Sequence, residues 1–176
     1  VYYGDSKVCE EENYEGLKKY ADFLQTASED GILKYFYYAD WVALEKTTGS
    51  LVSTFYYYYD TDIVAKVARI LGKTADAETY AQRAAQIKEA FHKHFYNPET
   101  RSYANGTQTA NTLALYLDLV PEKEREHVQQ SLTHDILYKH DTHVTTGFIG
   151  IKYLMELLPR IDRADPAGCA GEDHVA

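Results

Sequence analysis

The residues that could bind a polar ligand gather in three segments, and the first contains Asp40-Trp41. Four consecutive aromatic residues at positions 35–38 precede this pair, separated from it only by Ala39. An aromatic ring can stack on the C–H face of a sugar, and a neighbouring carboxylate accepts hydrogen bonds from the sugar hydroxyls. The pair therefore predicts one wall of a sugar site. A Trp packed in the loop's own small core, beside an Asp that caps a helix or turn, explains the same residues.

The second segment contains Tyr103, Asn105, Gly106 and Gln108. Asn105-Gly106 is a turn signal. Gln108 stands at the start of an otherwise apolar stretch, so its amide is expected to be buried and to need hydrogen-bond partners. Those partners are either neighbouring backbone groups or a bound ligand.

The third segment, 139–147, contains two histidines. His143 could titrate or hydrogen-bond a substrate near neutral pH. His140, Asp141 and His143 are residue types that bind metal ions, but their spacing matches no firm metal signature. No metal and no cofactor are therefore expected. Thr145 or Thr146 is predicted to cap the helix that follows.

Six helices are predicted to position these segments. Apolar spacing and Gly or Pro punctuation place them at about 10–25, 53–71, 75–95, 107–119, 121–139 and 146–158, the last ending before Pro159. The first, third and fifth are amphipathic. The fourth and sixth are apolar nearly all round, and the second is less uniform but has an aromatic start and an apolar middle. A helix that is apolar on every side is buried on every side.

This alternation predicts an all-α fold of outer and inner helices: a partial α/α toroid of the (α/α)6 barrel type, with about three helical hairpins. The long connections 30–53, 96–106 and 140–145 should then share one end of the ring. The minimal connections 72–74 and 120–121 should share the other. Free N–H groups of three inner helices would favour bound hydroxyls or carboxylates at the long-loop end. A helical-repeat solenoid is the alternative, although the helix pairs share no repeated signature.

Composition narrows the possible partners. The 176 residues carry a net charge of -9 without a basic run, which argues against nucleic acid and anionic membranes. No apolar run approaches the ~20 residues of a membrane span. Cys9 and Cys169 form neither a metal spacing nor a disulfide framework, so the redox compartment stays open.

Several elements, taken in order, resemble glycoside hydrolase family 78, the bacterial α-L-rhamnosidases, which are six-hairpin glycosidases. Residues 38–41 are similar to the family's Gly-Asp-Trp element, with Ala39 where the family usually has Gly. Residues 143–150 resemble its His-Leu-Thr-Thr-Gly-Phe segment. The resemblance covers about 14–158 and also includes these stretches: 47–54, 70–80, 103–108 and 114–122.

The resemblance implies a bacterial glycosidase that releases terminal α-L-rhamnose from glycosides or polysaccharides with inversion. It implies that Asp40 and Trp41 line the rhamnose pocket, with Gln108 and His143 nearby. Glycoside hydrolysis needs two carboxyl groups around one bond. The family's general acid lies upstream of the matching segment and its general base downstream. Both are therefore expected outside this chain, which alone should be inactive and whose partner would be the remainder of its own catalytic domain.

The resemblance also sets the expected domain limits. Residues 1–158 would be part of the catalytic domain, and 159–176 a non-matching, disordered tail. The location (periplasmic, extracellular or cytoplasmic) stays open. Two other functions remain as alternatives: a non-catalytic helical-repeat scaffold that binds a peptide or protein, and a different α/α-toroid sugar enzyme.

Overall fold

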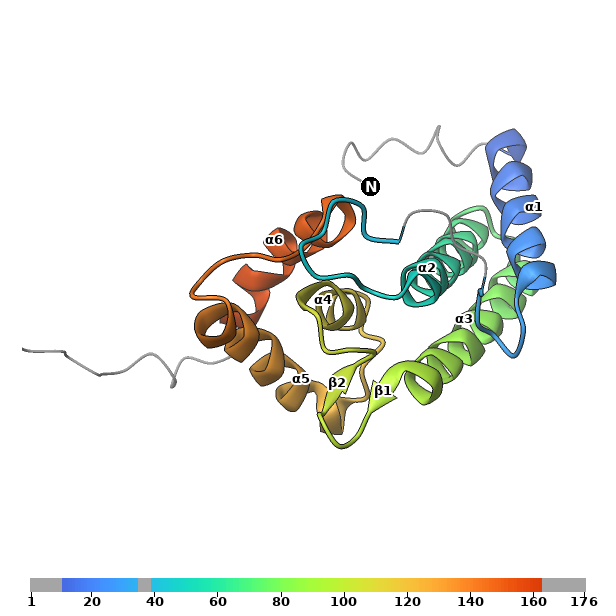
Figure 1. Ribbon diagram of the computed structural model, residues 1–176. Helices are drawn as coiled ribbons and strands as arrows, with labels where there is room; N and C mark the ends of the chain where they lie inside the picture. Colours follow the sequence, from blue (N-terminus) through green and yellow to red (C-terminus); the bar gives the residue numbers. More distant parts are fainter. Residues whose placement is uncertain (1–10, 35–38, 163–176) are drawn as a thin grey trace, which may run out of the picture.

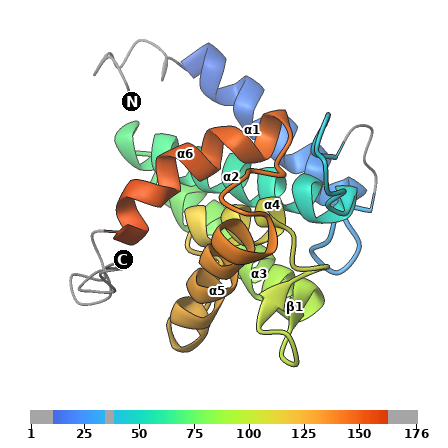
Figure 2. The same ribbon diagram turned by 60° about the vertical axis from the view of Figure 1, so that its left-hand side comes forward.

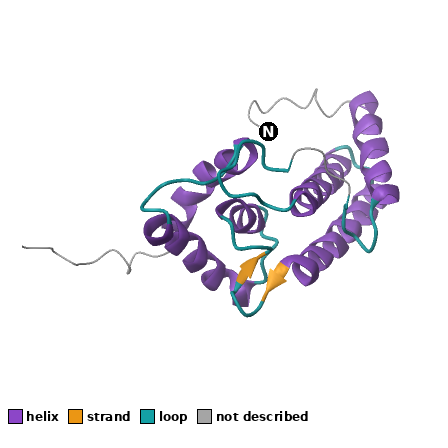
Figure 3. Ribbon diagram, viewed as in Figure 1, coloured by secondary structure: helices purple, strands orange, loops and turns teal. Residues whose placement is uncertain are grey.

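The computed structural model describes residues 11–34 and 39–162, which form six α-helices, a π-helical turn and a small hairpin (Figures 1 and 3). In chain order the elements are α1 Glu11–Ala27, α2 Gly49–Ile70, α3 Thr74–Phe95, β1 Tyr96–Asn97, β2 Ser102–Tyr103, α4 Gln108–Tyr116, α5 Glu122–His134, η2 Asp135–Lys139 and α6 Phe148–Asp162. The strands pair antiparallel, with Tyr96 opposite Tyr103 and Asn97 opposite Ser102.

The predicted alternation of outer and inner helices is confirmed. Helices α2, α4 and α6 form an inner arc, and α1, α3 and α5 lie outside it (Figure 1). All residues of α4 from Gln108 to Leu115 are buried. Helix α3 instead buries a single stripe with the predicted spacing: Ala77, Tyr80, Ala84, Ile87 and Phe91. These three hairpins are part of an α/α toroid, because the inner arc is covered by a second layer of helices.

Aromatic and aliphatic side chains join the inner helices to one another. Phe55 of α2 and Tyr116 of α4 both contact the ring of Tyr153 on α6, with centroid distances of 5.1 and 4.7 Å. Helices α4 and α6 pack against one another, and the turned view shows them as neighbours (Figure 2). A second apolar cluster, which includes Tyr14, Val64 and Tyr80, lies between α1, α2 and α3.

The sixth helix does not end before Pro159, so that prediction was wrong. Pro159 lies inside α6, which continues to Asp162. A proline removes one helical hydrogen bond, but here it stands close to the end of the helix. Leu157 is buried in the main core, and Leu158 and Ile161 pack against it, so tertiary contacts hold the last turn. Residues 163–176 of the predicted tail lie outside the described part of the chain.

The segment predicted as one helix, 121–139, changes character part-way. Helix α5 ends at His134 and continues as the π-helical turn η2, where the amide of His140 donates to the carbonyl of Asp135 at 3.0 Å. Short π-helical turns occur mostly where a helix bears a functional or strained site. This turn brings the buried Asp135 next to the loop that leads into α6.

Within the described residues, no helix combines the length and the apolarity that crossing a lipid bilayer requires.

Candidate sugar-binding site

The three long connections meet at one end of the helices, as predicted. The hydroxyls of Thr47 and Thr107 lie 2.6 Å apart, which joins the first connection to the second. The amide of Leu44 donates to the carbonyl of Thr145 at 3.0 Å, which joins the first to the third. The α/α arrangement therefore brings the predicted site segments together from positions about 60 and 100 residues apart.

Asp40 lies at the centre of this junction, with its carboxylate buried. One oxygen accepts the hydroxyl of Thr109 at 2.5 Å and the amide of Gly147 at 2.8 Å. The other accepts the amides of Ile149 and Gly150 at 3.0 and 3.1 Å. A carboxylate has about four lone-pair positions, so these donors occupy its whole hydrogen-bonding capacity.

Asp40-Trp41 thus caps the N-terminus of α6 from a distant part of the chain. The carbonyl of Trp41 accepts the amide of Phe148 at 3.0 Å, which satisfies another of the first amides of this helix. The prediction that Thr145 or Thr146 caps α6 was wrong. The hydroxyl of Thr145 faces Glu45 at 3.4 Å, and that of Thr146 is buried without a partner among the described residues. A carboxylate is the better cap because it also interacts favourably with the helix dipole.

Two glycines allow the loop to approach α6 this closely. A Cβ at Gly147 would collide with the carbonyl oxygen of Trp41 and lie 2.6 Å from the Asp40 carboxylate. A Cβ at Gly150 would collide with the hydroxyl of Thr109 and lie 2.8 Å from the same carboxylate. Both positions therefore require glycine because of space, not because of an unusual backbone angle.

Trp41 is held at the surface and does not form a buried mini-core. Its side chain is 60% exposed, and its ring stacks on Phe148 with centroids 5.5 Å apart and planes at 26°. Ala39 and Val42, on either side of the pair, adopt positive φ angles of 46° and 63°. A positive φ explains why a glycine would suit position 39. Trp41 and its neighbours line a groove of about 410 Å³, which is bordered by 39–43 and 46–49.

The side chain of Gln108 is hydrogen-bonded to His143, but to its backbone carbonyl and not to its imidazole. Gln108 is fully buried, and its amide nitrogen donates to the carbonyl of His143 at 3.1 Å and to the carboxylate of Asp135 at 3.0 Å. Its amide oxygen accepts the backbone N–H of Thr145 at 2.9 Å. The imidazole of His143 is exposed and donates to the carbonyl of Asp141 at 2.6 Å. Backbone groups or a ligand were the two possible partners of the Gln108 amide. In the structure its hydrogen bonds are made to protein groups.

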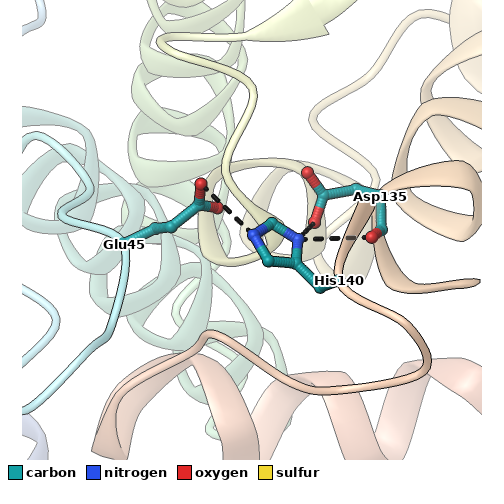
Figure 4. A group of neighbouring side chains, drawn as sticks. All are labelled: Glu45, Asp135 and His140. Atoms are coloured by element: carbon teal, nitrogen blue, oxygen red, sulfur yellow. Dashed lines mark hydrogen bonds and ion pairs between the residues drawn. The ribbon is translucent and has the colours of Figure 1, made fainter. Parts of the chain in front are cut away.

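A charged cluster beside this junction contains the one group of side chains that could hold a metal ion in the described ranges. Figure 4 shows His140 between the carboxylates of Asp135 and Glu45, 2.9 and 3.5 Å away. The ammonium group of Lys139 lies 2.9 Å from both carboxylates. A cation would have to displace Lys139, so the cluster functions as an ion-pair network that joins η2 to the first loop.

Asp135 is ionised in this network. Burial alone would raise its pKa, but hydrogen bonds from Lys139, Gln108 and His140 outweigh burial and lower the pKa. The carboxylates that meet at this junction are thus engaged by protein donors. Asp40 caps α6, Asp135 pairs with Lys139 and accepts a hydrogen bond from Gln108, and Glu45 pairs with Lys139 and Thr145.

Residues 1–168 match the family described as the bacterial alpha-L-rhamnosidase 6 hairpin glycosidase domain. The chain belongs to this family. It is 31% identical over 175 residues to an alpha-L-rhamnosidase of Formosa agariphila, covering 94% of this chain and 19% of that protein. It is 28% identical over 174 residues to an alpha-L-rhamnosidase of an Alteromonas species, covering 92% of this chain and 19% of that one.

Solved structures of α-L-rhamnosidases share the fold. The enzyme from Dictyoglumus thermophilum superposes with a TM-score of 0.84 at 40% identity, over 89% of this chain and 18% of that one. The Streptomyces avermitilis enzyme, solved in complex with L-rhamnose, superposes with a TM-score of 0.83 at 26% identity, over 92% and 15%. The chain therefore spans about a fifth of the length of the family members it matches. The family match continues past Leu158 to residue 168, further than the sequence resemblance indicated.

Sequence reasoning missed three members of this site. Phe148 was included in an inner helix expected to be buried, yet it is 66% exposed. Thr109 lies in the stretch 107–119 that was predicted as a buried helix, and Glu45 lies in the long connection 30–53, for which no role was predicted residue by residue. Only Phe148 carried a usable signal: it directly follows Gly147 at the start of an inner helix whose N-terminus was predicted to lie at the site.

Proposed function

We propose that this chain forms part of the sugar-binding wall of an α-L-rhamnosidase, a glycoside hydrolase that releases terminal α-L-rhamnose with inversion. The observation that carries the proposal is the exposed Trp41 at the meeting point of three toroid loops, in a chain that belongs to the rhamnosidase family. An exposed indole beside a groove of about 410 Å³ suits a sugar ring, since grooves of this size hold small ligands.

In this proposal the four site residues divide into two roles. Trp41 contacts the sugar, and the exposed His143 donates or accepts a hydrogen bond at the edge of the site. Asp40 and Gln108 act from beneath: the first holds Trp41 on α6, and the second holds the loop that bears His143. The hydrogen bonds of the two buried side chains support this division. The donors of the Gln108 amide are both used, and the Asp40 carboxylate has no free lone pair.

The proton-transfer carboxyl groups lie, in this proposal, in other parts of the longer protein. An inverting glycosidase needs a general acid whose pKa is raised and a second carboxylate ~6.5–9.5 Å away. Asp135 has a lowered pKa, opposite to what an acid requires. Burial raises the pKa of Asp60 to about 6, but Asp60 is eleven residues into α2, about 16 Å along the helix from the loop end.

The test compares the 176-residue chain with the longer protein that carries it. Each is incubated with an aryl α-L-rhamnoside, and the anomer released is identified by NMR. The longer protein should release β-L-rhamnose first, and the chain alone should release none. Turnover by the chain alone that disappears in Asp40→Ala would contradict the view that the acid pair lies elsewhere.

In the part of the chain that the structure describes, no observation favours a helical-repeat scaffold over a rhamnosidase segment.

A further inference from the structure

The proposed function gives no role to Phe148, whose ring is exposed beside Trp41. Phe148 is the first residue of α6 and is 66% exposed, whereas Gly150, Tyr153, Leu154 and Leu157 on another face of this helix are buried. Its ring lies 5.5 Å from that of Trp41, and the planes are inclined by only 26°. The two stacked side chains thus form one exposed aromatic pair from two segments more than 100 residues apart, and each ring leaves its uncovered part to solvent.

The surrounding structure fixes this pair of rings. The Phe148 amide donates to the carbonyl of Trp41, so the two backbones are bonded directly beneath their side chains. Asp40 bonds the amides on both sides of Phe148, at Gly147 and Ile149. A ring pair held in this way loses little conformational entropy when a ligand covers it.

We propose that Phe148 is a second substrate-contacting residue, which forms with Trp41 a two-ring platform for the sugar substrate. The inference rests on the proposed function and adds a residue to its site. A substrate with an apolar face longer than one sugar residue would contact both rings, because both are exposed and they lie against one another. Carbohydrate C–H faces and aryl leaving groups both provide such a face.

Another explanation for an exposed Phe is contact with the rest of the catalytic domain, and α6 offers a matched control for it. Met155 lies seven residues after Phe148, on the same side of the helix, and is 62% exposed. A domain contact along this face of α6 would involve both residues. A substrate platform at the loop end would involve only Phe148.

The test uses Phe148→Ala, Phe148→Tyr and Met155→Ala in the longer protein that carries this chain, with kcat and KM measured on an aryl α-L-rhamnoside. We expect Phe148→Ala to raise KM about tenfold, the size of one lost stacking contact. Phe148→Tyr keeps a ring and should retain the original KM, and Met155→Ala should leave KM unchanged.

Two results would overturn the inference. One is an unchanged KM in Phe148→Ala. The other is an equal loss of thermal stability in Phe148→Ala and Met155→Ala without a specific change in KM, which would indicate a domain contact. An inactive wild-type protein would contradict the proposed function instead, so the two failures are distinguishable.

Discussion

The two ends of this helical arc are built in different ways. At the short-turn end, Lys73 bonds to Ala68 and Leu119 bonds to Ala114, so these backbone hydrogen bonds join residues five positions apart. At the loop end, Asp40 bonds to residues 69 to 110 positions away. The short turns are therefore specified by local sequence, whereas the loop end exists only when all three hairpins have assembled. A site at the loop end is correspondingly sensitive to any change that separates the hairpins.

The largest effect should come from a side chain inserted between the loop and α6. Gly147→Ala would push its Cβ into the Trp41 carbonyl and the Asp40 carboxylate, and backbone cannot move aside cheaply. We expect the free energy of unfolding of the chain to fall by about 4 kcal/mol. Urea denaturation followed by circular dichroism measures this loss.

Two other glycines serve as controls for Gly147→Ala. Gly72, at the short-turn end, has open space around it but a φ of +71°, so Gly72→Ala should cost only about 1 kcal/mol. Gly16 is a helical residue of α1 with nothing within 4 Å, and Gly16→Ala should stabilise the chain by about 0.5–1 kcal/mol. If Gly147→Ala and Gly72→Ala lowered the free energy of unfolding equally, the proposed difference between the two ends would be wrong.

The next largest effect concerns the distant cap of α6. Asp40→Ala leaves the amides of Gly147, Ile149 and Gly150 without their acceptor, and we expect a loss of about 3 kcal/mol in the free energy of unfolding. Asp40→Asn retains one acceptor oxygen and should lose less. Trp41 is the only Trp of the chain, so its fluorescence reports whether the loop has left α6. A loss below 0.5 kcal/mol, with unchanged emission, would contradict the capping role.

A smaller effect should follow from the ion-pair network around Asp135. The folded state lowers the pKa of Asp135, so its carboxylate stabilises the fold above its unfolded pKa near 3.8. That contribution is lost as the pH falls through the folded pKa. We expect Asp135→Asn to cost about 1 kcal/mol at pH 7 and at pH 5, and less at pH 3.

Asp118 is the matched carboxylate at the short-turn end. It also pairs with a cation, Arg125, but its side chain is 71% exposed. Its φ of 54° suits Asn, so Asp118→Asn should change the stability little at any of these pH values. If Asp118→Asn lowered the free energy of unfolding as much as Asp135→Asn, and with the same dependence on pH, the buried position of Asp135 would not explain its effect.

The same contrast explains what could be predicted from the sequence. Apolar periodicity and Gly or Pro punctuation are local, and they predicted all six helices and both short turns. The contacts of Asp40 could not be predicted, because its partners lie in α4 and in the segment that opens α6. The course of α6 through Pro159 was missed for a related reason: packing of Leu157 and its neighbours overrides a local breaker.

The types of the site residues were informative, but their roles were not. Asp40-Trp41 indicated either a sugar wall or a cap within a small core, and the structure combines parts of both: Asp40 caps a helix, and Trp41 is exposed. Gln108 was correctly expected to be buried and bonded. Phe148 looked like core because the apolar residues of this helix extend onto a face that the described residues leave exposed, which Met155 shares, and periodicity alone does not show which face is covered.

We infer that Trp41 contacts the sugar and that Asp40 holds Trp41 in place from beneath. A crystal structure of the longer protein with bound L-rhamnose tests this most directly. We expect the sugar ring to lie in van der Waals contact with the indole of Trp41, and the Asp40 carboxylate to remain hydrogen-bonded to Thr109, Gly147, Ile149 and Gly150. A rhamnose hydroxyl within hydrogen-bond distance of the Asp40 carboxylate, or a sugar bound away from Trp41, would contradict it.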